Sequence, residues 1–360
     1  MKVLHIEAGR YLYGGAQQVA WLVDGLSRQG VDNVLVCPSG SSIASECRAA
    51  CKVVEIPMGG DLDIVQIWRL SRLFAVEKPN LVHIHSRRGA DVFGGLAAKL
   101  AGIPCVLSRR VDNRESRLMA ACKYSLYARV VVISDAIGEV LRSCGVKGGL
   151  IRPVRSAVDH QRYRVTADPD WFHHEFGLPS DAMVLAMIAQ LIPRKGHQYF
   201  LSILPDLLAR YPNLYVLIFG QGPLADELDK RVTSEALTER VTMAGFRNDL
   251  DRVLPNLYAV IHPAEREGLG VALLQSSAAG VPVVAAAAGG IPEIIRHEEN
   301  GLIVEVGDVD ALSRSIESLL LSSDYRNALG EAGQRMAEEE FSIDAMVAGN
   351  LSVYRELVAN

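Results

Sequence analysis

The chain has 360 residues, 49% of them hydrophobic, and a formal net charge of −5. Its length predicts two domains, and its hydrophobic content is enough to fill two cores. The N-terminal sequence MKVLHIEAG shows no apolar leader, and no apolar run approaches the roughly 18 residues of a membrane span, so we expect neither a secreted nor a membrane-spanning protein. We therefore expect a cytoplasmic protein, which could also lie peripherally on the inner face of the cytoplasmic membrane.

Positive and negative charges are divided unevenly along the chain. Residues 1–165 carry 23 Lys and Arg against 14 Asp and Glu, a net of +9, whereas residues 166–360 carry 14 against 28, a net of −14. A basic half on an acidic protein indicates an anionic acceptor, a membrane surface or nucleic acid, with scattered surface charge as the alternative. No RNP, helix-turn-helix or zinc-finger pattern accompanies the charge, so we expect no nucleic-acid partner.

The first elements read as a strand, a glycine loop and a helix. An apolar run over residues 3–8 precedes Gly14 and Gly15, and apolar residues then recur at helical spacing up to Leu26. The glycines match neither GxGxxG nor Walker A spacing. An ordinary tight turn is therefore the alternative to a phosphate-binding loop.

Short strand-like runs alternate with helix-length segments through the rest of the first half. This alternation predicts a doubly wound α/β sheet, in which ligands bind beyond the carboxyl ends of the strands. Polar clusters follow two of the strands, from His83 to Arg88 and from Ser108 to Asp112, while Ser134 after a third strand is expected to cap a helix. The strand-like runs are 33–37, 53–56, 81–84, 105–108, 129–133 and 150–152.

A segment with six basic residues runs from Arg109 to Arg129. Apolar residues are interleaved with the charges, which suits a helix near anionic headgroups or phosphorylated sugars. A solvated helix with an ordinary core face is the alternative. The basic residues expected to border an anionic, membrane-attached acceptor are Arg87, Arg88, Arg109, Arg110, Arg114, Arg117, Lys123 and Arg129, and the apolar contacts with lipid are expected from Leu118, Met119, Tyr124 and Tyr127.

The helix and strand pattern breaks at residues 159–179, which are polar and aromatic with two prolines, and we place the domain boundary there. A second series of strands and helices follows, so two doubly wound domains are expected to leave a cleft between their strand ends. Three strand-end loops of this half are expected to point into it, at residues 190–196, 220–223 and 245–247. The first carries two cations before a helix, an arrangement suited to a diphosphate.

Residues 262–295 are the most informative stretch. A strand runs into a loop that contains Glu265, Glu267 and a Gly-Leu-Gly turn, and a helix follows from Val271. Glycines let the backbone approach a ligand, and a helix N-terminus presents free N–H groups, which predicts an anion site. An acid in such a loop is expected to contribute little to the core.

Four motifs together resemble the retaining, nucleotide-sugar-dependent glycosyltransferases of family 4. They are KGHQYF, FGQGP, the Gly245-Phe246 turn and EGLGVALLQSSAAGVPVVAAAAGGIPEII, with weaker support from Gly14-Gly15, the HIHS strand end and the SAVD run. The resemblance covers essentially the whole chain. It implies a GT-B fold, with a Rossmann-like acceptor-binding domain over 1–165, a Rossmann-like donor-binding domain over 166–342, and a terminal helix within 343–360 that packs back on the first domain.

The resemblance also implies roles for single residues. Glu267 matches the acid that approaches the donor sugar, and Lys195 matches the cation that holds the diphosphate. Arg110 stands where the family often has a histidine, and it is the second residue with an expected catalytic role. The other donor-binding residues are Gly14, Gly15, Gln190, Arg194, Gly220, Phe246, Gly268, Leu269, Gly270, Val271 and Gln275, and the acceptor-side residues are His85, Arg109 and Asp112.

Two positions depart from the family pattern. The second acid, expected eight residues after Glu267, is replaced by Gln275, which can still exchange hydrogen bonds with a ribose. The Gly-Arg often found before the lysine is Ala189-Gln190, so one phosphate cation is missing. Arg194 or Arg110 would then supply its charge.

The leading expectation is transfer of a sugar from a nucleoside-diphosphate sugar to a hydroxyl of a glycan or lipid-linked acceptor, such as lipopolysaccharide, with retention of configuration. The nucleotide sugar is a co-substrate, and no cofactor is expected. No convincing DxD-like metal pair stands at a strand end, so no metal is expected either. One alternative is a nucleotide-sugar 2-epimerase of related fold. The other is a nucleotide-sugar-binding protein that has lost catalysis, which Gln275 and Gln190 favour.

Overall fold

The computed structural model describes residues 1–12, 14–86 and 89–358, so Arg87 and Arg88, which the sequence placed at a strand end, lie outside the described residues. The chain forms two compact units. One consists of Met1–Ala157 with Ile343–Asn360, and the other of Val158–Ser342. The first unit therefore ends at Ala157, before the boundary expected at residue 165.

The first unit contains a parallel seven-stranded sheet in the order β3-β2-β1-β4-β5-β6-β7. Its central strands are runs of Val, Leu and Ile whose side chains are buried, as expected where helices cover both faces of a sheet. The sequence order reverses between β1 and β4. The strands are β1 (Lys2–Ile6), β2 (Asp32–Pro38), β3 (Lys52–Ile56), β4 (Leu81–Ile84), β5 (Cys105–Arg109), β6 (Arg129–Val132) and β7 (Ile151–Pro153).

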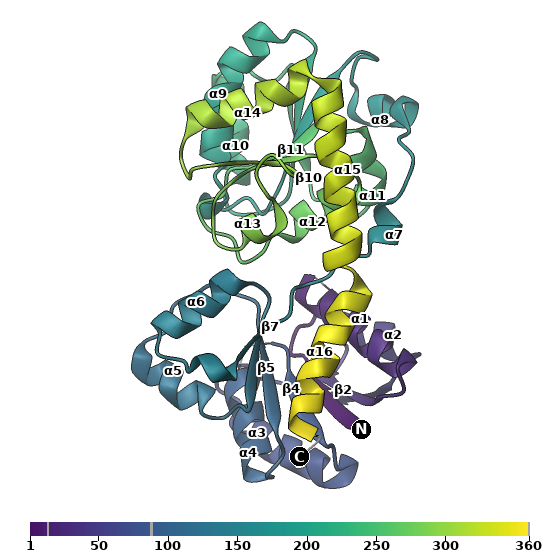
Figure 1. The fold of residues 1–360 in the computed structure, drawn as a ribbon, viewed down its shortest axis with the longest axis vertical. Coiled ribbons are helices and arrows are strands. Elements are labelled where there is room, and N and C mark those ends of the chain that lie inside the picture. The colour runs from purple at the N-terminus through teal and green to yellow at the C-terminus, as the bar shows by residue number, and fades with distance from the viewer. Residues whose placement is uncertain (13, 87–88, 359–360) are drawn as a thin grey trace. The chain divides into compact units, whose positions relative to one another are not determined.

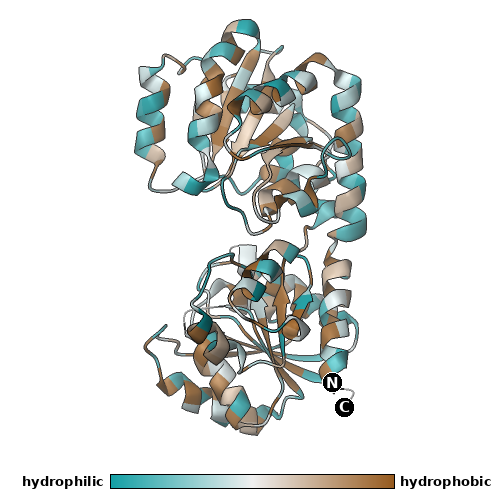
Figure 2. Cartoon of the chain, turned by 60° about the vertical axis from the view of Figure 1, so that its left-hand side comes forward, coloured by the Kyte–Doolittle hydropathy of each residue, from teal (hydrophilic) through white to brown (hydrophobic). Residues whose placement is uncertain are grey.

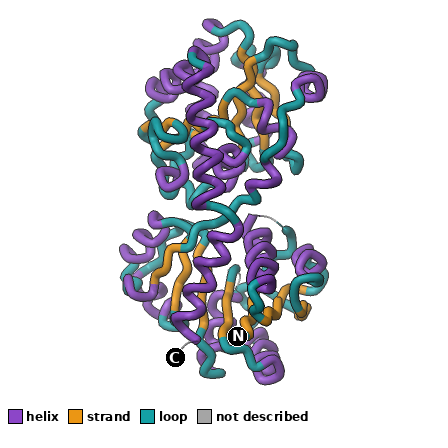
Figure 3. Tube along the Cα trace, turned by 45° about the vertical axis from the view of Figure 1, so that its right-hand side comes forward, coloured by secondary structure: helices purple, strands orange, loops and turns teal. Residues whose placement is uncertain are grey.

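The second unit repeats this topology in six parallel strands, in the order β10-β9-β8-β11-β12-β13. The order reverses between β8 and β11, the counterparts of β1 and β4. Both sheets confirm the predicted doubly wound α/β class, and Figure 3 shows the strands of each unit between layers of helices. The strands are β8 (Met183–Ile188), β9 (Leu214–Phe219), β10 (Val241–Gly245), β11 (Ala259–His262), β12 (Val283–Ala286) and β13 (Leu302–Val304).

Amphipathic helices connect the strands and turn their apolar faces to the sheets, so hydrophobic colour gathers on the strands in Figure 2. Ser134 caps α6 as predicted, since its hydroxyl accepts a hydrogen bond from the N–H of Ile137 at 3.2 Å. In the first unit the helices are α1 (Gly14–Arg28), α2 (Ser42–Cys47), α3 (Val65–Glu77), η1 (Ala90–Gly94), α4 (Gly95–Leu100), α5 (Arg117–Tyr124), α6 (Asp135–Ser143), η2 (Gly148–Leu150) and α16 (Ile343–Val358). In the second unit they are α7 (His160–Tyr163), α8 (Pro169–Phe176), η3 (Pro193–Lys195), α9 (His197–Arg210), α10 (Ala225–Ser234), α11 (Leu250–Val253), η4 (Leu254–Asn256), α12 (Val271–Ala278), α13 (Ile291–Ile294), α14 (Val309–Leu321) and α15 (Ser323–Glu340).

The last helix, α16, packs on the first unit beside α1, as Figure 1 shows. A glycine makes this close approach possible, because a Cβ atom on Gly25 would lie 2.4 Å from Cγ2 of Val347. Tyr354 of α16 is fully buried, and its hydroxyl lies 2.5 Å from Nδ1 of His83 on β4. Glu356 pairs with Arg129 and Arg152. The helix is thus an integral part of the first unit's core.

Among the described residues, no helix combines the length and the apolar composition needed to cross a membrane.

Gly25→Ala should destabilise the first unit by about 1–3 kcal/mol, because the added methyl group overpacks the contact with Val347. Urea unfolding followed by circular dichroism would measure the loss. The control is Gly149→Ala, since a Cβ at Gly149 meets nothing within 4 Å. Equal midpoints for Gly25→Ala and the parent would show that α16 does not pack this tightly on α1.

Candidate functional site

The residues predicted to bind a ligand in the second unit lie on loops at the carboxyl ends of its strands, around the reversal between β8 and β11. In doubly wound sheets this is the place where ligands bind. Backbone hydrogen bonds join these loops to one another. The N–H of Leu191 donates to the carbonyl of Gln221 at 3.0 Å, and that of Glu265 donates to the carbonyl of Arg194 at 2.9 Å. The loops therefore form one connected surface.

Two glycines let these loops approach more closely than other residues could. A Cβ on Gly196 would lie 1.9 Å from the carbonyl oxygen of Pro263, and one on Gly289 would lie 1.9 Å from that of Glu267. Both glycines also have positive φ, at 76° and 56°. Gly196 and Gly289 thus allow the loop of Lys195 and the loop after β12 to pack directly against the loop of Glu267.

Glu267 forms the centre of this surface. Its carboxylate accepts hydrogen bonds from Lys195 Nζ, from His262 Nε2 at 3.1 Å and from the N–H of Gly268 at 3.1 Å. Burial acts to raise the pKa of Glu267, but the His262 hydrogen bond and the charge of Lys195 outweigh it and lower the pKa to about 2. The side chain is only 14% exposed and holds three partners, so we expect Glu267 to support the fold as well as the site, contrary to the expectation from the sequence.

His262 is a site residue to which the sequence assigned no role. It ends the buried strand β11 and is only 2% exposed. A carboxylate only accepts hydrogen bonds, so Nε2 of His262 must carry the proton that Glu267 receives. Burial also holds the pKa of His262 below its ordinary value. The sequence feature that could have identified His262 is its position at the end of the apolar run AVIH, because a polar side chain in a buried strand must have a partner.

The other predicted donor-binding residues of this unit lie on loops that follow its strands or on α12. Gly268 and Leu269 lead into α12, and Gly270, with φ of 102°, immediately precedes Val271 at its start. Gln275 is half-buried on the same helix, and Arg194 stands beside Lys195 on η3. Gln190 is exposed after β8, and Gly220 follows β9.

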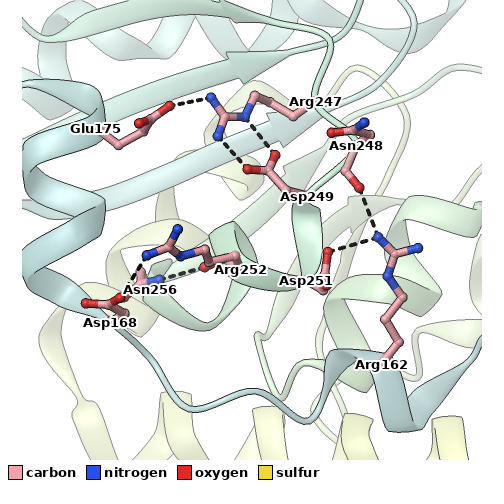
Figure 4. A network of polar contacts seen from close by, with 9 residues as sticks. All are labelled: Arg162, Asp168, Glu175, Arg247, Asn248, Asp249, Asp251, Arg252 and Asn256. Atoms are coloured by element: carbon pink, nitrogen blue, oxygen red, sulfur yellow. Dashed lines mark hydrogen bonds and ion pairs between the residues drawn. The ribbon is translucent and has the colours of Figure 1, made fainter.

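Phe246 follows β10 and is 60% exposed, on a loop that ion pairs anchor to neighbouring helices (Figure 4). Arg247 donates to Asp249 at 2.6 and 2.8 Å and to Glu175 of α8 at 2.6 Å. Arg252 reaches Asp168 at 3.1 Å. The network fixes the loop while leaving the Phe246 ring accessible, a combination that suits stacking against a planar ligand.

In the first unit, Gly14 and Gly15 begin α1, and Arg110 follows β5. The Arg110 side chain lies against Gly15, since its Cδ would be 3.7 Å from a Cβ placed there. Burial lowers the pKa of Arg110, and the negative charge of Glu7 opposes that shift. Nε of Arg110 is buried without a hydrogen-bond partner in the described part of the chain. A partly buried arginine whose Nε donor is buried and unpaired is ready to bind an anion or a hydroxyl.

Arg109 and Asp112, expected on the acceptor side, share one loop. Arg109 is only 2% exposed and binds its own loop, donating to the carbonyls of Val111 at 2.9 Å and Asn113 at 2.5 Å and to Glu115 at 3.2 Å. These contacts give Arg109 a structural role in shaping the loop. Asp112 is half-buried there. The acceptor-side roles of both residues stay predictions.

Known protein families match both halves of the chain. The model described as Glycosyltransferase Family 4 matches residues 13–162, and the model described as Glycosyl transferases group 1 matches residues 170–336. The boundary between the two matches coincides with the polar stretch in which the domain boundary was predicted.

Full-length relatives and a solved structure agree with these matches. The lipopolysaccharide core biosynthesis glycosyltransferase LpsE of Rhizobium meliloti is 26% identical over 100% of this chain and 99% of its own. An Escherichia coli UDP-Gal:alpha-D-GlcNAc-diphosphoundecaprenol alpha-1,3-galactosyltransferase is 21% identical over 100% and 98%. Anabaena Alr3699/HepE, solved with UDP and glucose, superimposes with a TM-score of 0.85 at 18% identity over 99% and 100%, which shows a shared fold.

Glu267→Gln should lower stability at pH 7 by about 1–3 kcal/mol, because the neutral amide leaves Lys195 buried without a counter-charge. The pKa of Glu267 is about 2 in the folded protein, below its ordinary value of 4.5. The stabilisation is therefore complete above the unfolded-state value and is lost as the pH falls toward 2.

Urea unfolding of parent and variant between pH 7 and pH 2.5 would measure this difference. Glu265→Gln is the control, because Glu265 is exposed in the same loop. A gap between the parent and Glu267→Gln that stays constant with pH would contradict the assignment.

Proposed function

Because the chain belongs to the group 1 glycosyltransferases, we propose that it transfers a sugar from a nucleoside-diphosphate sugar to a hydroxyl of a cell-envelope glycan, with retention of configuration. The contact of Lys195 with Glu267 at the β8/β11 reversal is the observation that supports this most strongly. It places an ammonium group and an ionised carboxylate together, at the position in the fold where a ligand is expected.

The chemistry needs both charges. As the sugar's C1–O bond to the diphosphate breaks, negative charge grows on the diphosphate and positive charge grows at C1. Lys195 and the N–H groups at the start of α12 would stabilise the diphosphate, and Glu267 would stabilise the sugar. A C1–O bond to the acceptor hydroxyl then forms on the same face, and the hydroxyl proton leaves with the diphosphate. These residues supply the stabilisation without a metal ion.

The nature of the co-substrates is proposed from the relatives. HepE binds UDP and glucose, and the names of LpsE and the Escherichia coli enzyme refer to lipopolysaccharide core and a diphosphoundecaprenol-linked sugar. A nucleoside-diphosphate hexose donor fits HepE and the Escherichia coli enzyme, and a lipid-linked or lipopolysaccharide acceptor fits LpsE and the Escherichia coli enzyme. The replacement of the second family acid by Gln275 favours the alternative of a binding protein without catalysis. Turnover measurements separate these two functions.

The acceptor's lipid suggests a membrane contact, which we place on α3 and the loop before it. The α3 face consists of the exposed apolar residues Leu62 (91% exposed), Ile64 (67%), Val65 (50%), Trp68 (59%) and Val76 (74%). Val65, Trp68 and Val76 fall on one helical stripe, together with Arg72, whose guanidinium carbon lies 4.7 Å from the centre of the Trp68 ring. An apolar stripe with tryptophan and cations suits the interface of a bilayer.

The charges around the α3 face favour an anionic surface. Asp63 pairs with Arg69 at 2.7 Å, and Glu77 is buried against Lys2 and Lys52. Arg72 and Lys78 remain exposed, while Asp61 is an exposed acid at one end. Each cation near an anionic bilayer contributes roughly 1 kcal/mol within a Debye length of about 8 Å.

The segment from Arg109 to Arg129 fits a membrane contact less well than the sequence suggested. Tyr124 and Tyr127 are buried, at 2% and 4% exposed, so they cannot reach a bilayer. Lys123 is held by Asp91 at 2.5 Å and by Glu115 at 3.1 Å. The expectation for Tyr124 and Tyr127 was wrong, because these two residues belong to the core, and the ion pairs of Lys123 occupy its charge. Leu118 and Met119 are exposed, at 76% and 67%.

The nucleotide site can be tested by thermal shift with UDP-, GDP-, ADP- and CMP-sugars, because a ligand that binds only the folded protein raises its melting temperature. One donor class should stabilise the parent and turn over when an acceptor is present. Lys195→Ala should lose about 1.5–3 kcal/mol of binding free energy for the sugar nucleotide and for the free diphosphate alike. Lys230→Ala on the exposed face of α10 is the control. Stabilisation without any turnover would support the binding protein instead.

The membrane contact can be tested by sedimentation with vesicles of phosphatidylethanolamine and phosphatidylglycerol. Binding should be strong at low salt and fall as salt rises. The pair Leu62→Ser and Trp68→Ser should abolish it, since each large apolar side chain buried in the bilayer contributes roughly 1.5–3 kcal/mol. Leu321→Ser, which removes a leucine 74% exposed in the second unit, should have no effect. A parent that ignores these vesicles at low salt would overturn the membrane proposal and leave the transferase proposal intact.

A further inference from the structure

Three buried histidines lie together in the first unit, at the reversal between β1 and β4. His5 is on β1, His83 is on β4, and His85 directly follows β4, where its backbone N–H donates to the carbonyl of Ile6 at 2.9 Å. All three are at most 3% exposed. Their ring nitrogens form hydrogen bonds that can be followed atom by atom, which assigns the protons.

The assignment starts from Asn33 on β2. Its Nδ2 donates to the carbonyl of Val31 at 3.0 Å and to Ser27 Oγ at 2.9 Å. A carbonyl only accepts, so this end of the amide is the nitrogen, and Oδ1 faces Nε2 of His5 at 3.1 Å. Nε2 of His5 must therefore carry a proton.

The proton on His5 in turn determines which nitrogen of His85 is protonated. Burial lowers the pKa of His5 to about 4, so the ring is neutral at pH 7, and its Nδ1 has a lone pair and no proton. Nδ1 of His5 lies 3.0 Å from Nε2 of His85. The hydrogen between them must belong to His85. Burial, followed by the charges of His83, His5 and Arg110, keeps the pKa of His85 well below its ordinary value, so its proton on Nε2 is the ring's only one.

Nδ1 of His85 is consequently a bare hydrogen-bond acceptor. It is buried and meets no partner among the residues that the structure describes. Leaving a buried acceptor unsatisfied is costly, so such an atom indicates a ligand donor that the free chain lacks. Arg110, whose charge acts on His85, follows the neighbouring strand β5 and has its own unpaired donor at Nε.

We infer that Nδ1 of His85 accepts a hydrogen bond from a hydroxyl of the glycosyl acceptor, and that Asn33 and His5 position it by fixing its tautomer. A sugar hydroxyl both donates and accepts, so it matches an imidazole acceptor and a guanidinium donor at adjacent strand ends. The inference rests on the proposed function for the identity of the ligand. His5 and Asn33 act only through His85 and are positioning residues.

A metal ion is the rival explanation of the cluster. The ring nitrogens of His5, His83 and His85 lie within 4.8 Å of one another, which is close enough to share an ion. However, both nitrogens of His5, both of His83 and Nε2 of His85 already lie within hydrogen-bond distance of Asn33, Ser108, Tyr354 or each other. A cation would have to break several of these contacts beside the positive charge of Arg110. The hydrogen-bonded arrangement therefore favours an organic ligand.

Side-chain nitrogen NMR of the histidines tests the tautomer directly. In the free parent protein, His85 should show the neutral ring protonated at Nε2, with its signal assigned by its loss in His85→Gln. His5→Leu should abolish the single tautomer, and His5→Asn, which keeps an acceptor near Nδ1, should restore it. His174→Gln, at an exposed position on α8, is the control. A proton found on Nδ1 of His85, or a stoichiometric metal in the purified protein, would overturn the inference.

The ligand is tested with octyl glucoside, octyl galactoside and octyl mannoside, added together with the nucleotide sugar that stabilises the parent. At least one glycoside should shift the Nδ1 signal of His85, and no shift with any of them would overturn the inference. His85→Gln keeps a donor toward His5 but lacks the Nδ1 acceptor, so its KM for that glycoside should rise about tenfold, as for one lost hydrogen bond. His85→Asn keeps an acceptor near Nδ1 and should recover most of the loss.

A parent that binds no nucleotide sugar would instead overturn the proposed function. A parent that binds one, while His85→Gln leaves the KM for the glycoside unchanged, would overturn only the role given to His85.

Discussion

The second unit depends on keeping one carboxylate ionised inside the protein. Glu267 is mostly buried, and an isolated charge there would be expelled or neutralised. Lys195, His262 and the N–H of Gly268 supply the compensation, each from a different position along the chain. Lys195 follows β8 and His262 ends β11, and the pairing of these two strands brings both partners to the carboxylate. The topology of the sheet therefore helps to keep Glu267 ionised.

Both units hold polar side chains inside the protein at the reversal of the strand order, but they stabilise them in different ways. In each, polar side chains gather where the strand order reverses, since two loops there leave the sheet in opposite directions and leave room between them. The second unit fills this place with an ion pair. The first unit fills it with the buried imidazoles of His5 and His85, whose protons are assigned through Asn33, and with the cation of Arg110. A fixed charge suits a phosphate, whereas fixed neutral donors and acceptors suit hydroxyls.

The fold was predictable because alternating apolar runs and helix-length segments directly reflect a doubly wound sheet. The site was predictable only in part. Motifs located Glu267 and Lys195, but they could not show that the two residues contact each other or that Glu267 supports the fold. His262 and His5 were overlooked because a histidine inside an apolar strand has no local signature, and its partner lies on another strand. Tyr124 and Tyr127 were wrongly predicted to face a lipid surface, since an apolar residue in a basic segment can face either the core or the solvent.

The first unit is built from both ends of the chain, and this affects when it can complete its folding during synthesis. The first unit begins at the N-terminus but includes α16, whose Tyr354 bonds His83 and whose Val347 packs on Gly25. During synthesis, which proceeds at roughly 5–20 residues per second, residues 1–157 leave the ribosome first, and the whole second unit follows before α16 emerges. The earlier-made strands must wait with an uncovered apolar face until the last helix emerges. An uncovered apolar face favours aggregation, so the nascent N-terminal segment depends on α16 to complete its fold.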